Sequence, residues 1–113
     1  NTAKGLEYSD NDPDFYRELL RLFTEEAPKS LERLSSALAD NDLELYTTLV
    51  HGLKNNARGI GADSAGELCF EAEQTARAGN AAPLPELHLK IEQAITEAAA
   101  EAARLSEAEK ITQ

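Results

Sequence analysis

The sequence has few of the residues on which most chemical sites depend. Its 113 residues include one cysteine, two histidines, no tryptophan and no methionine. One cysteine excludes an intrachain disulfide, and no His, Cys, Asp or Glu spacing repeats a metal-ligand motif. We therefore expect no metal and no cofactor on this chain, and a buried position for Cys69, whose helical neighbours are alanines. The lack of methionine even at position 1 indicates a processed product or a piece of a longer protein.

Basic residues and long apolar runs are also scarce. Lys and Arg number 11 against 21 Asp and Glu, which gives a formal net charge of -10. A surface of this charge repels nucleic-acid phosphates and anionic lipids. No apolar stretch approaches the roughly 20 residues that a membrane span needs, and no signal peptide is recognisable. We expect a cytoplasmic monomer that binds no nucleic acid and does not insert into membranes.

Strand patterns are nearly absent, whereas helix-forming Ala, Leu, Glu and Arg dominate. Asp12 and Pro13 form a typical helix start, with a capping carboxylate followed by a proline in the first turn. Pro28 is predicted to break or kink this helix. A second segment then leads to a polar turn at residues 40–42.

Three further helices are predicted. The first covers about 42–61, the next runs from 63 or 64 to an exit at 79–80, and the last begins at 83–85 and ends near Leu105. Short connections favour antiparallel neighbours. The predicted fold is all-α, an antiparallel up-and-down four-helix bundle with a short additional N-terminal helical segment. In this prediction the bundle covers residues 12–106, residues 1–11 form an N-terminal extension, and residues 107–113 form a frayed C-terminal tail.

The third predicted helix presents a histidine to solvent. Its apolar stripe is centred near Val50 and Leu53, and His51 lies roughly 140° from that centre on a helical projection. The same outer side carries further polar or small residues, with the lysine nearest the core boundary. These are Lys54, Asn55, Arg58 and Gly59.

This helix is also rich in poor helix formers, namely Gly52, Asn55, Asn56 and Gly59. A glycine inside a helix costs about 1 kcal/mol relative to alanine. Such a violation indicates either a functional surface or glycines that permit close helix packing. The sequence favours neither explanation.

An exposed histidine beside a lysine is chemically suited to carry a phosphoryl group. A neutral imidazole is a nucleophile, and a cation at position i+3 is able to face the phosphoryl oxygens. Lys54 stands at that position, whereas Arg58 at i+7 has a longer reach. Without further context, however, an exposed histidine near a lysine is usually an ordinary surface residue.

The sequence around this histidine resembles a known family signature. Residues 51–62, HGLKNNARGIGA, are similar to the histidine-containing phosphotransfer (HPt) motif, in which histidine is followed by an apolar residue at +2, lysine at +3, usually glycine at +4, and an apolar-Gly-Ala ending. Residues 23–39 resemble the family's FxxExPxxLxxLxxAL stretch, and residues 67–80 its helix ending ExxARxGD. Asn55 departs from the usual glycine, and Arg58 stands where a small residue is common.

The resemblance implies a phosphocarrier without catalytic machinery of its own, either free-standing or a segment of a hybrid histidine kinase. His51 would accept a phosphoryl group from a receiver-domain aspartate and pass it to another receiver, with Lys54 as electrostatic support. The partner receiver would supply Mg²⁺, and a hybrid sensor kinase is a further possible partner. The alternative is a non-phosphorylated interaction module that docks a partner through the Gly/Asn-rich face.

Two other positions can be placed by geometry. If the third and fourth helices form a hairpin that turns near Ala62, then Glu73 or Gln74 lies level with His51. Either residue would orient the imidazole through one ring nitrogen, or both are ordinary solvated residues. His88 is predicted to be a boundary residue beside the apolar stripe of the last helix.

Overall fold

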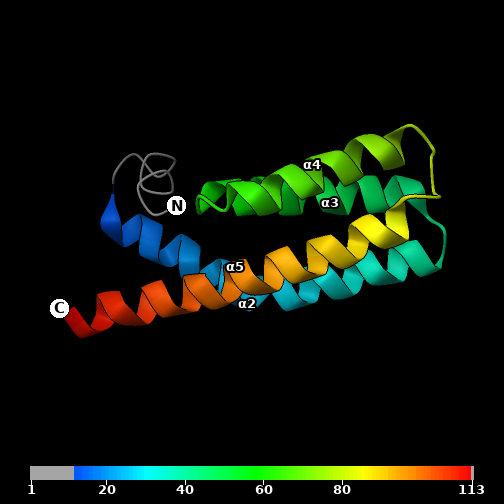
Figure 1. Ribbon diagram of the computed structural model, residues 1–113. Helices are drawn as coiled ribbons and strands as arrows, with labels where there is room; N and C mark the ends of the chain where they lie inside the picture. Colours follow the sequence, from blue (N-terminus) through cyan, green and yellow to red (C-terminus); the bar gives the residue numbers. More distant parts are fainter. Residues whose placement is uncertain (1–11, 113) are drawn as a thin grey trace.

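The computed structural model describes residues 12–112, with side chains through residue 106, and contains four α-helices and no strand over this range. They are α2 (Pro13–Ala39), α3 (Leu43–Gly59), α4 (Asp63–Arg77) and α5 (Leu84–Thr112). Successive helices run in opposite directions (Figure 1), so the predicted all-α up-and-down bundle is confirmed. The predicted extension at residues 1–11 lies outside the described residues.

Two helices begin at capping aspartates, the predicted Asp12 and, in the predicted polar turn at residues 40–42, Asp42. Asp12 Oδ1 accepts from the backbone N–H of Asp14 at 3.0 Å and of Phe15 at 3.2 Å. Asp42 Oδ1 accepts from the N–H of Leu45 at 3.1 Å. Each cap satisfies a backbone donor that the first helical turn leaves without a partner. The starts of α2 and α3 are therefore local properties of the sequence.

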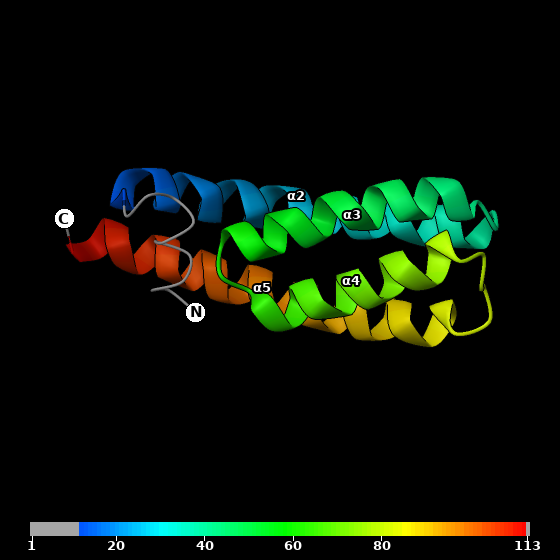
Figure 2. The same cartoon turned by 90° about the horizontal axis from the view of Figure 1, so that it is seen from above.

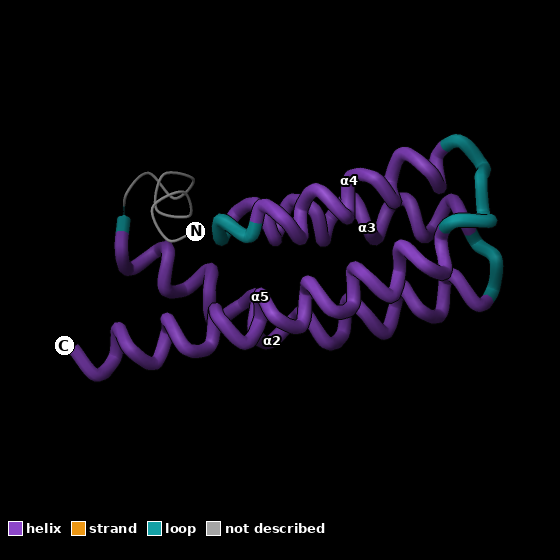
Figure 3. The backbone as a smooth tube through the Cα atoms, in the orientation of Figure 1, coloured by secondary structure: helices purple, strands orange, loops and turns teal. Residues whose placement is uncertain are grey.

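Of the break or kink predicted at Pro28, the break does not occur. Helix α2 continues through this residue, so the short additional N-terminal segment is the first half of one 27-residue helix. Figure 3 shows one unbroken helical tube whose first turns are inclined to the rest. Phe23 and Ala27 before the proline, and Leu34 and Ala37 after it, are all buried. Burial of this face on both sides of Pro28 outweighs the loss of one backbone hydrogen bond.

The prediction for the C-terminus is also wrong, because α5 continues to Thr112 instead of ending near Leu105. The backbone of residues 107–112, predicted to be a frayed tail, is helical. This segment contains no proline or glycine, and its Glu, Ala and Lys residues are good helix formers. Helix propensity is sufficient to explain the extension.

The core lies between the four helices, each of which contributes one apolar face (Figure 2). Tyr46, Leu34 and Ile91 are among its fully buried side chains. The predicted burial of Cys69 is confirmed, since it is 0% exposed. Burial raises the pKa of the Cys69 thiol to about 12, against the opposing charges of Arg58 and Lys54. The thiol therefore stays protonated at neutral pH and behaves as a small apolar side chain.

His88 is buried and not at the boundary, with an exposed fraction of 5%. Its Nδ1 lies 3.3 Å from the Tyr46 hydroxyl, and the two rings meet edge to face with centroids 6.1 Å apart. The tyrosine supplies a polar partner inside the core, which allows the imidazole to be buried. This contact joins α5 to α3. No helix in the described part of the chain is long and apolar enough to cross a membrane.

Candidate functional site

His51 projects from the outer face of α3, as its angular position predicted. Its side chain is 51% exposed, whereas its neighbour Val50 is fully buried. The adjoining Gly52 is exposed as well. The imidazole is therefore accessible to another protein.

Glu73 of α4 holds one nitrogen of this imidazole. His51 Nδ1 lies 2.8 Å from Glu73 Oε2, and the glutamate side chain is only 2% exposed. The prediction that Glu73 or Gln74 lies level with His51 is confirmed for Glu73, while Gln74 is exposed on α4. A carboxylate oxygen accepts hydrogen bonds, so Nδ1 carries the proton. In the neutral imidazole, Nε2 is then the unprotonated nitrogen, with its lone pair available.

Lys54 contacts the same carboxylate from α3. Its Nζ donates to Glu73 Oε1 at 2.7 Å and lies 3.3 Å from His51 Nδ1. Because Nδ1 already carries a proton, this second contact is a close approach of a cation and not a hydrogen bond. The Lys54 side chain is only 10% exposed, so it lies deeper than its predicted position near the boundary.

Arg77 completes the group around Glu73, and no role was predicted for it from the sequence. Its Nη2 donates to Glu73 Oε2 at 2.8 Å, although the arginine side chain is 59% exposed. Burial acts to raise the pKa of Glu73, but hydrogen bonds and charges from Lys54 and His51 outweigh it, so the pKa is lowered. The i,i+4 spacing of Glu73 and Arg77 was the signal available in the sequence.

Asn55 approaches the other nitrogen of the imidazole. Its side-chain Nδ2 lies 3.4 Å from His51 Nε2, and both side chains are exposed. Asn55 stands one helical turn after the histidine, where the resemblance leads one to expect glycine. Its amide group is thus beside the nitrogen that carries the lone pair.

Arg58 does not join this group and instead lies across α4. Its guanidinium is 3.6 Å from Glu67 and 5.8 Å from the ring centroid of Phe70. A Cβ on Gly66 would come within 2.9 Å of Arg58 Cγ, so the absence of a side chain there leaves room for the arginine. Phe70, which sequence reasoning missed, is 41% exposed. Its ring centroid also lies 5.5 Å from Lys54 Nζ.

The glycines of α3 are not explained by close helix packing. A Cβ added to Gly52 or Gly59 would meet nothing within 4 Å. Of the two explanations left open by the sequence, packing against another helix of this chain is therefore wrong. The glycines instead leave open space on α3 next to the histidine and about two turns beyond it.

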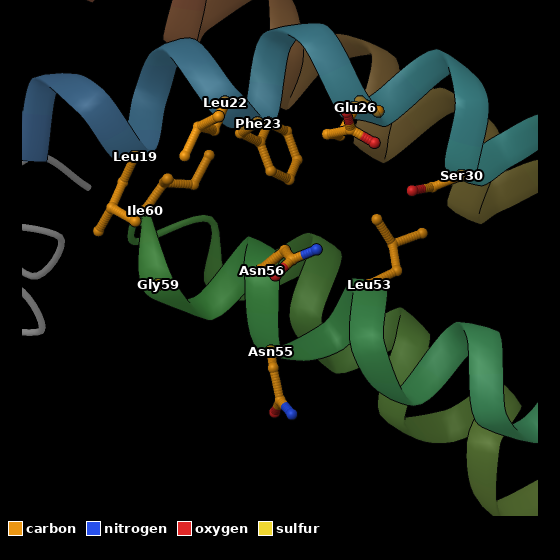
Figure 4. Close-up of a pocket in the computed structure, with 11 residues that line it drawn as sticks. Leu19, Leu22, Phe23, Glu26, Ser30, Leu53, Asn55, Asn56, Gly59 and Ile60 are labelled. Carbon is orange, nitrogen blue, oxygen red and sulfur yellow. The ribbon is translucent and has the colours of Figure 1, made fainter.

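A cleft of about 470 Å³ lies between α2 and α3 beside this surface. Figure 4 shows Leu22 and Phe23 of α2 facing Leu53 of α3 and Ile60, the residue that follows α3, across it. Asn56 points toward α2, while Asn55 points away from it. The cleft is mainly apolar and adjoins the part of α3 that carries the histidine.

Most of the chain, including the residues around His51, matches one known family. The model described as "Hpt domain" matches residues 18–101, which is most of the chain and includes His51, Lys54 and Glu73. The chain belongs to the Hpt family. Members of this family act in histidine phosphotransfer within two-component phosphorelays, so this chain is a histidine phosphotransfer domain and a phosphocarrier.

Two solved Hpt structures have the same fold. One is the HPT domain of a sensor hybrid histidine kinase from Shewanella, with a TM-score of 0.85 and 19% identity over 93% of this chain and 91% of that one. The other is histidine-containing phosphotransfer protein B from Pseudomonas aeruginosa, with a TM-score of 0.86 and 21% identity over 95% and 93%. A search of the curated proteins found no match.

The described residues of this Hpt domain contain no group of three or more His, Cys, Asp or Glu side chains able to hold a metal ion. The site consists of one exposed imidazole, one buried carboxylate and the cations that surround that carboxylate.

Proposed function

We propose that His51 is the phosphoacceptor of this domain and that Nε2 is the attacking atom. The observation that carries the proposal is the hydrogen bond of 2.8 Å between Nδ1 and the buried Glu73. This bond places the ring proton on Nδ1 and leaves the lone pair on the nitrogen that a partner can reach.

In the forward step, Nε2 attacks the phosphorus atom of a phosphoaspartate on a receiver domain. The Nε2–P bond forms, the P–O bond to the aspartyl carboxylate breaks, and the electron pair of that bond leaves with the carboxylate. The proton stays on Nδ1, so the phosphorylated ring is cationic and Glu73 neutralises it. The reverse sequence on a second receiver returns His51 to its starting state.

Little catalytic machinery is required on this side of the reaction. Phosphoryl transfer depends mainly on positioning and charge neutralisation, and in the proposal the receiver supplies Mg²⁺ and the acidic pocket that binds it. Gly52, next to His51, and Gly59, about two turns further along α3, leave open space where the receiver's backbone would approach. The apolar cleft beside them would accommodate receiver side chains. We propose a cytoplasmic monomer in this role.

Phosphorylation of His51 is tested by incubating the chain with a phosphorylated receiver domain and Mg²⁺. An acid-labile, base-stable label on the wild-type chain, absent from His51→Gln, is expected for phosphohistidine. No label on the wild-type chain from several receivers, or an equal label on His51→Gln, would contradict the proposal. The first of these results would favour the alternative function, a non-phosphorylated module that only docks a partner.

Lys54 is proposed to act through Glu73 as well as through its own charge. The structure makes Lys54→Ala an ambiguous test, because this change leaves the buried Glu73 carboxylate without its closest cation. We expect Lys54→Ala to slow transfer and also to destabilise the fold, whereas Lys54→Arg should retain most of both properties. Transfer kinetics and urea unfolding of both variants separate the two effects. An unchanged transfer rate in Lys54→Ala would remove Lys54 from the mechanism.

A further inference from the structure

The amide of Asn55 is placed to contact whatever becomes bonded to His51. Its Nδ2 lies 3.4 Å from Nε2, the nitrogen that the proposed function assigns to phosphoryl transfer. Figure 4 shows this side chain directed away from α2. Among the described residues, Asn55 is the polar side chain found within hydrogen-bonding reach of Nε2.

The contact is weak before transfer. At 3.4 Å it is longer than the usual range for an N–H donor, about 2.7–3.2 Å. The donor points toward a neutral lone pair in an exposed position, so an incoming phosphorus atom displaces it at little cost. The asparagine therefore does not block the nucleophile.

The contact becomes stronger after transfer. Nε2 is then bonded to phosphorus, and charged phosphoryl oxygens occupy the space on the side of the asparagine. An N–H that donates to an ionised acceptor forms a hydrogen bond about twice as strong as a neutral one. The amide has two such donors and needs only side-chain rotation to reach the oxygens.

We propose that Asn55 holds the phosphoryl group on His51 by donating a hydrogen bond to a phosphoryl oxygen, which lengthens the lifetime of the phosphohistidine. This inference rests on the proposed function of His51. Spontaneous loss breaks the P–Nε2 bond, returns the electron pair to Nε2 and joins the phosphorus to a water oxygen. The phosphoryl group separates from the ring in a loose, metaphosphate-like transition state. A donor placed for the bound phosphoryl group therefore stabilises the starting state more than the transition state.

The lifetime can be measured without any receiver. The wild-type chain and its variants are phosphorylated with phosphoramidate, a small donor whose P–N bond breaks with release of ammonia. The donor is removed, and the decay of phosphorylated protein is followed by intact mass at neutral pH. We expect the half-life to fall about threefold in Asn55→Ala, which loses the donor. We expect a fall of about tenfold in the isosteric Asn55→Asp, whose carboxylate repels the phosphoryl oxygens.

Asn56→Ala is the matched control, because this neighbouring asparagine points toward α2. Its half-life should equal that of the wild-type chain, and the amide-retaining Asn55→Gln should recover part of the loss. The ¹H–¹⁵N NMR signals of the Asn55 side-chain amide should shift on phosphorylation, while those of Asn56 stay in place. These signals report the hydrogen bond directly, and a purely structural role for Asn55 would not move them.

The outcomes separate this inference from the function on which it rests. If phosphoramidate labels the wild-type chain on His51, but Asn55→Ala and Asn55→Asp decay at the wild-type rate, the role of Asn55 is overturned and the phosphocarrier stands. If the wild-type chain takes no label from phosphoramidate or from a receiver, the proposed function fails, and the role of Asn55 fails with it.

Discussion

At the scale of single residues, Glu73 determines the state of the site. It is a carboxylate with 2% exposure that contacts the imidazole, an ammonium group and a guanidinium group. The partners have different exposures, since Lys54 is nearly buried and Arg77 is mostly exposed. The Lys54 contact is therefore the least screened of the ion pairs, and Glu73 supports both the fold and the tautomer of His51.

We expect Glu73→Gln to destabilise the protein by about 3 kcal/mol, because it leaves the buried Lys54 without a counter-charge. The free energy of unfolding in urea measures this loss. Lys54→Met should cost a similar amount, and the double variant should lose less than the sum of the two single losses, since it leaves neither charge unpaired. Strictly additive losses would show that the two groups do not stabilise each other.

The same carboxylate should make stability depend on acid pH. Hydrogen bonds and charges from Lys54 and His51 outweigh burial, so the pKa of Glu73 is lower in the folded chain than in the unfolded chain. A group with a lowered folded-state pKa stabilises the fold above its unfolded pKa, about 4.3, and this contribution disappears as the pH falls through the folded value. Between about pH 5 and pH 3, the wild-type chain should therefore lose more unfolding free energy than Glu73→Gln. Equal losses in urea unfolding would contradict this role.

At the scale of elements, the sequence of α3 does not maximise the stability of that helix. It carries Gly52 and Gly59 where larger residues would fit without a clash. In helix α2, by contrast, tertiary packing adds to the stability of the helix. Packing on both sides of Pro28 preserves the helix where the local preference of proline would end it. Helix α4 contributes Glu73 and Arg77 from one face, so the site depends on the α3–α4 hairpin.

Gly52→Ala should separate stability from function. A Cβ at this exposed helical position meets nothing within 4 Å, so we expect the free energy of unfolding to rise by about 0.5–1 kcal/mol. Transfer from a phosphorylated receiver should nevertheless become several-fold slower, because the methyl group occupies space needed by the partner. Labelling by phosphoramidate, which needs no docking surface, serves as the control and should be unchanged. Unchanged transfer from the receiver would show that the open surface at Gly52 is not used.

At the scale of the whole molecule, the net charge of -10 opposes compaction. Exposed ion pairs within single helices, such as Arg21 with Glu25 and Arg104 with Glu101, act in the other direction. Such pairs contribute little, typically less than about 1 kcal/mol each. Repulsion among the excess carboxylates is therefore expected to be the larger effect of the surface charges.

Raising the NaCl concentration from about 0.01 M to about 0.1 M shortens the Debye length from about 30 Å to about 10 Å. We expect Tm to rise by roughly 3 °C, since screening weakens the repulsion more than it weakens the local ion pairs. Thermal unfolding followed by circular dichroism measures the change. A lower Tm in the added salt would mean that the surface ion pairs dominate.

Local sequence features predicted much of this protein. Asp12 and the polar turn that contains Asp42 marked helix starts, and the apolar stripe of α3 directed His51 outward. The length of the α3–α4 hairpin placed Glu73 or Gln74 level with His51, and the structure selects Glu73. The prediction of His88 at a boundary was wrong, because its partner Tyr46 lies 42 residues away in the sequence. Arg77 and Phe70 were missed because their roles come from contacts with side chains of other residues around the site.

The sequence by itself determined the all-helical class, two helix starts, the antiparallel order of the helices and the exposed histidine, because caps, turns and apolar periodicity act over a few residues. Only the tertiary structure decided that α2 passes through Pro28, since burial on both sides of the proline belongs to the whole bundle. The tertiary structure also decided that His51 has its proton on Nδ1. That state requires the buried carboxylate of Glu73 from another helix. The pKa of Glu73 depends in turn on cations brought together from α3 and α4.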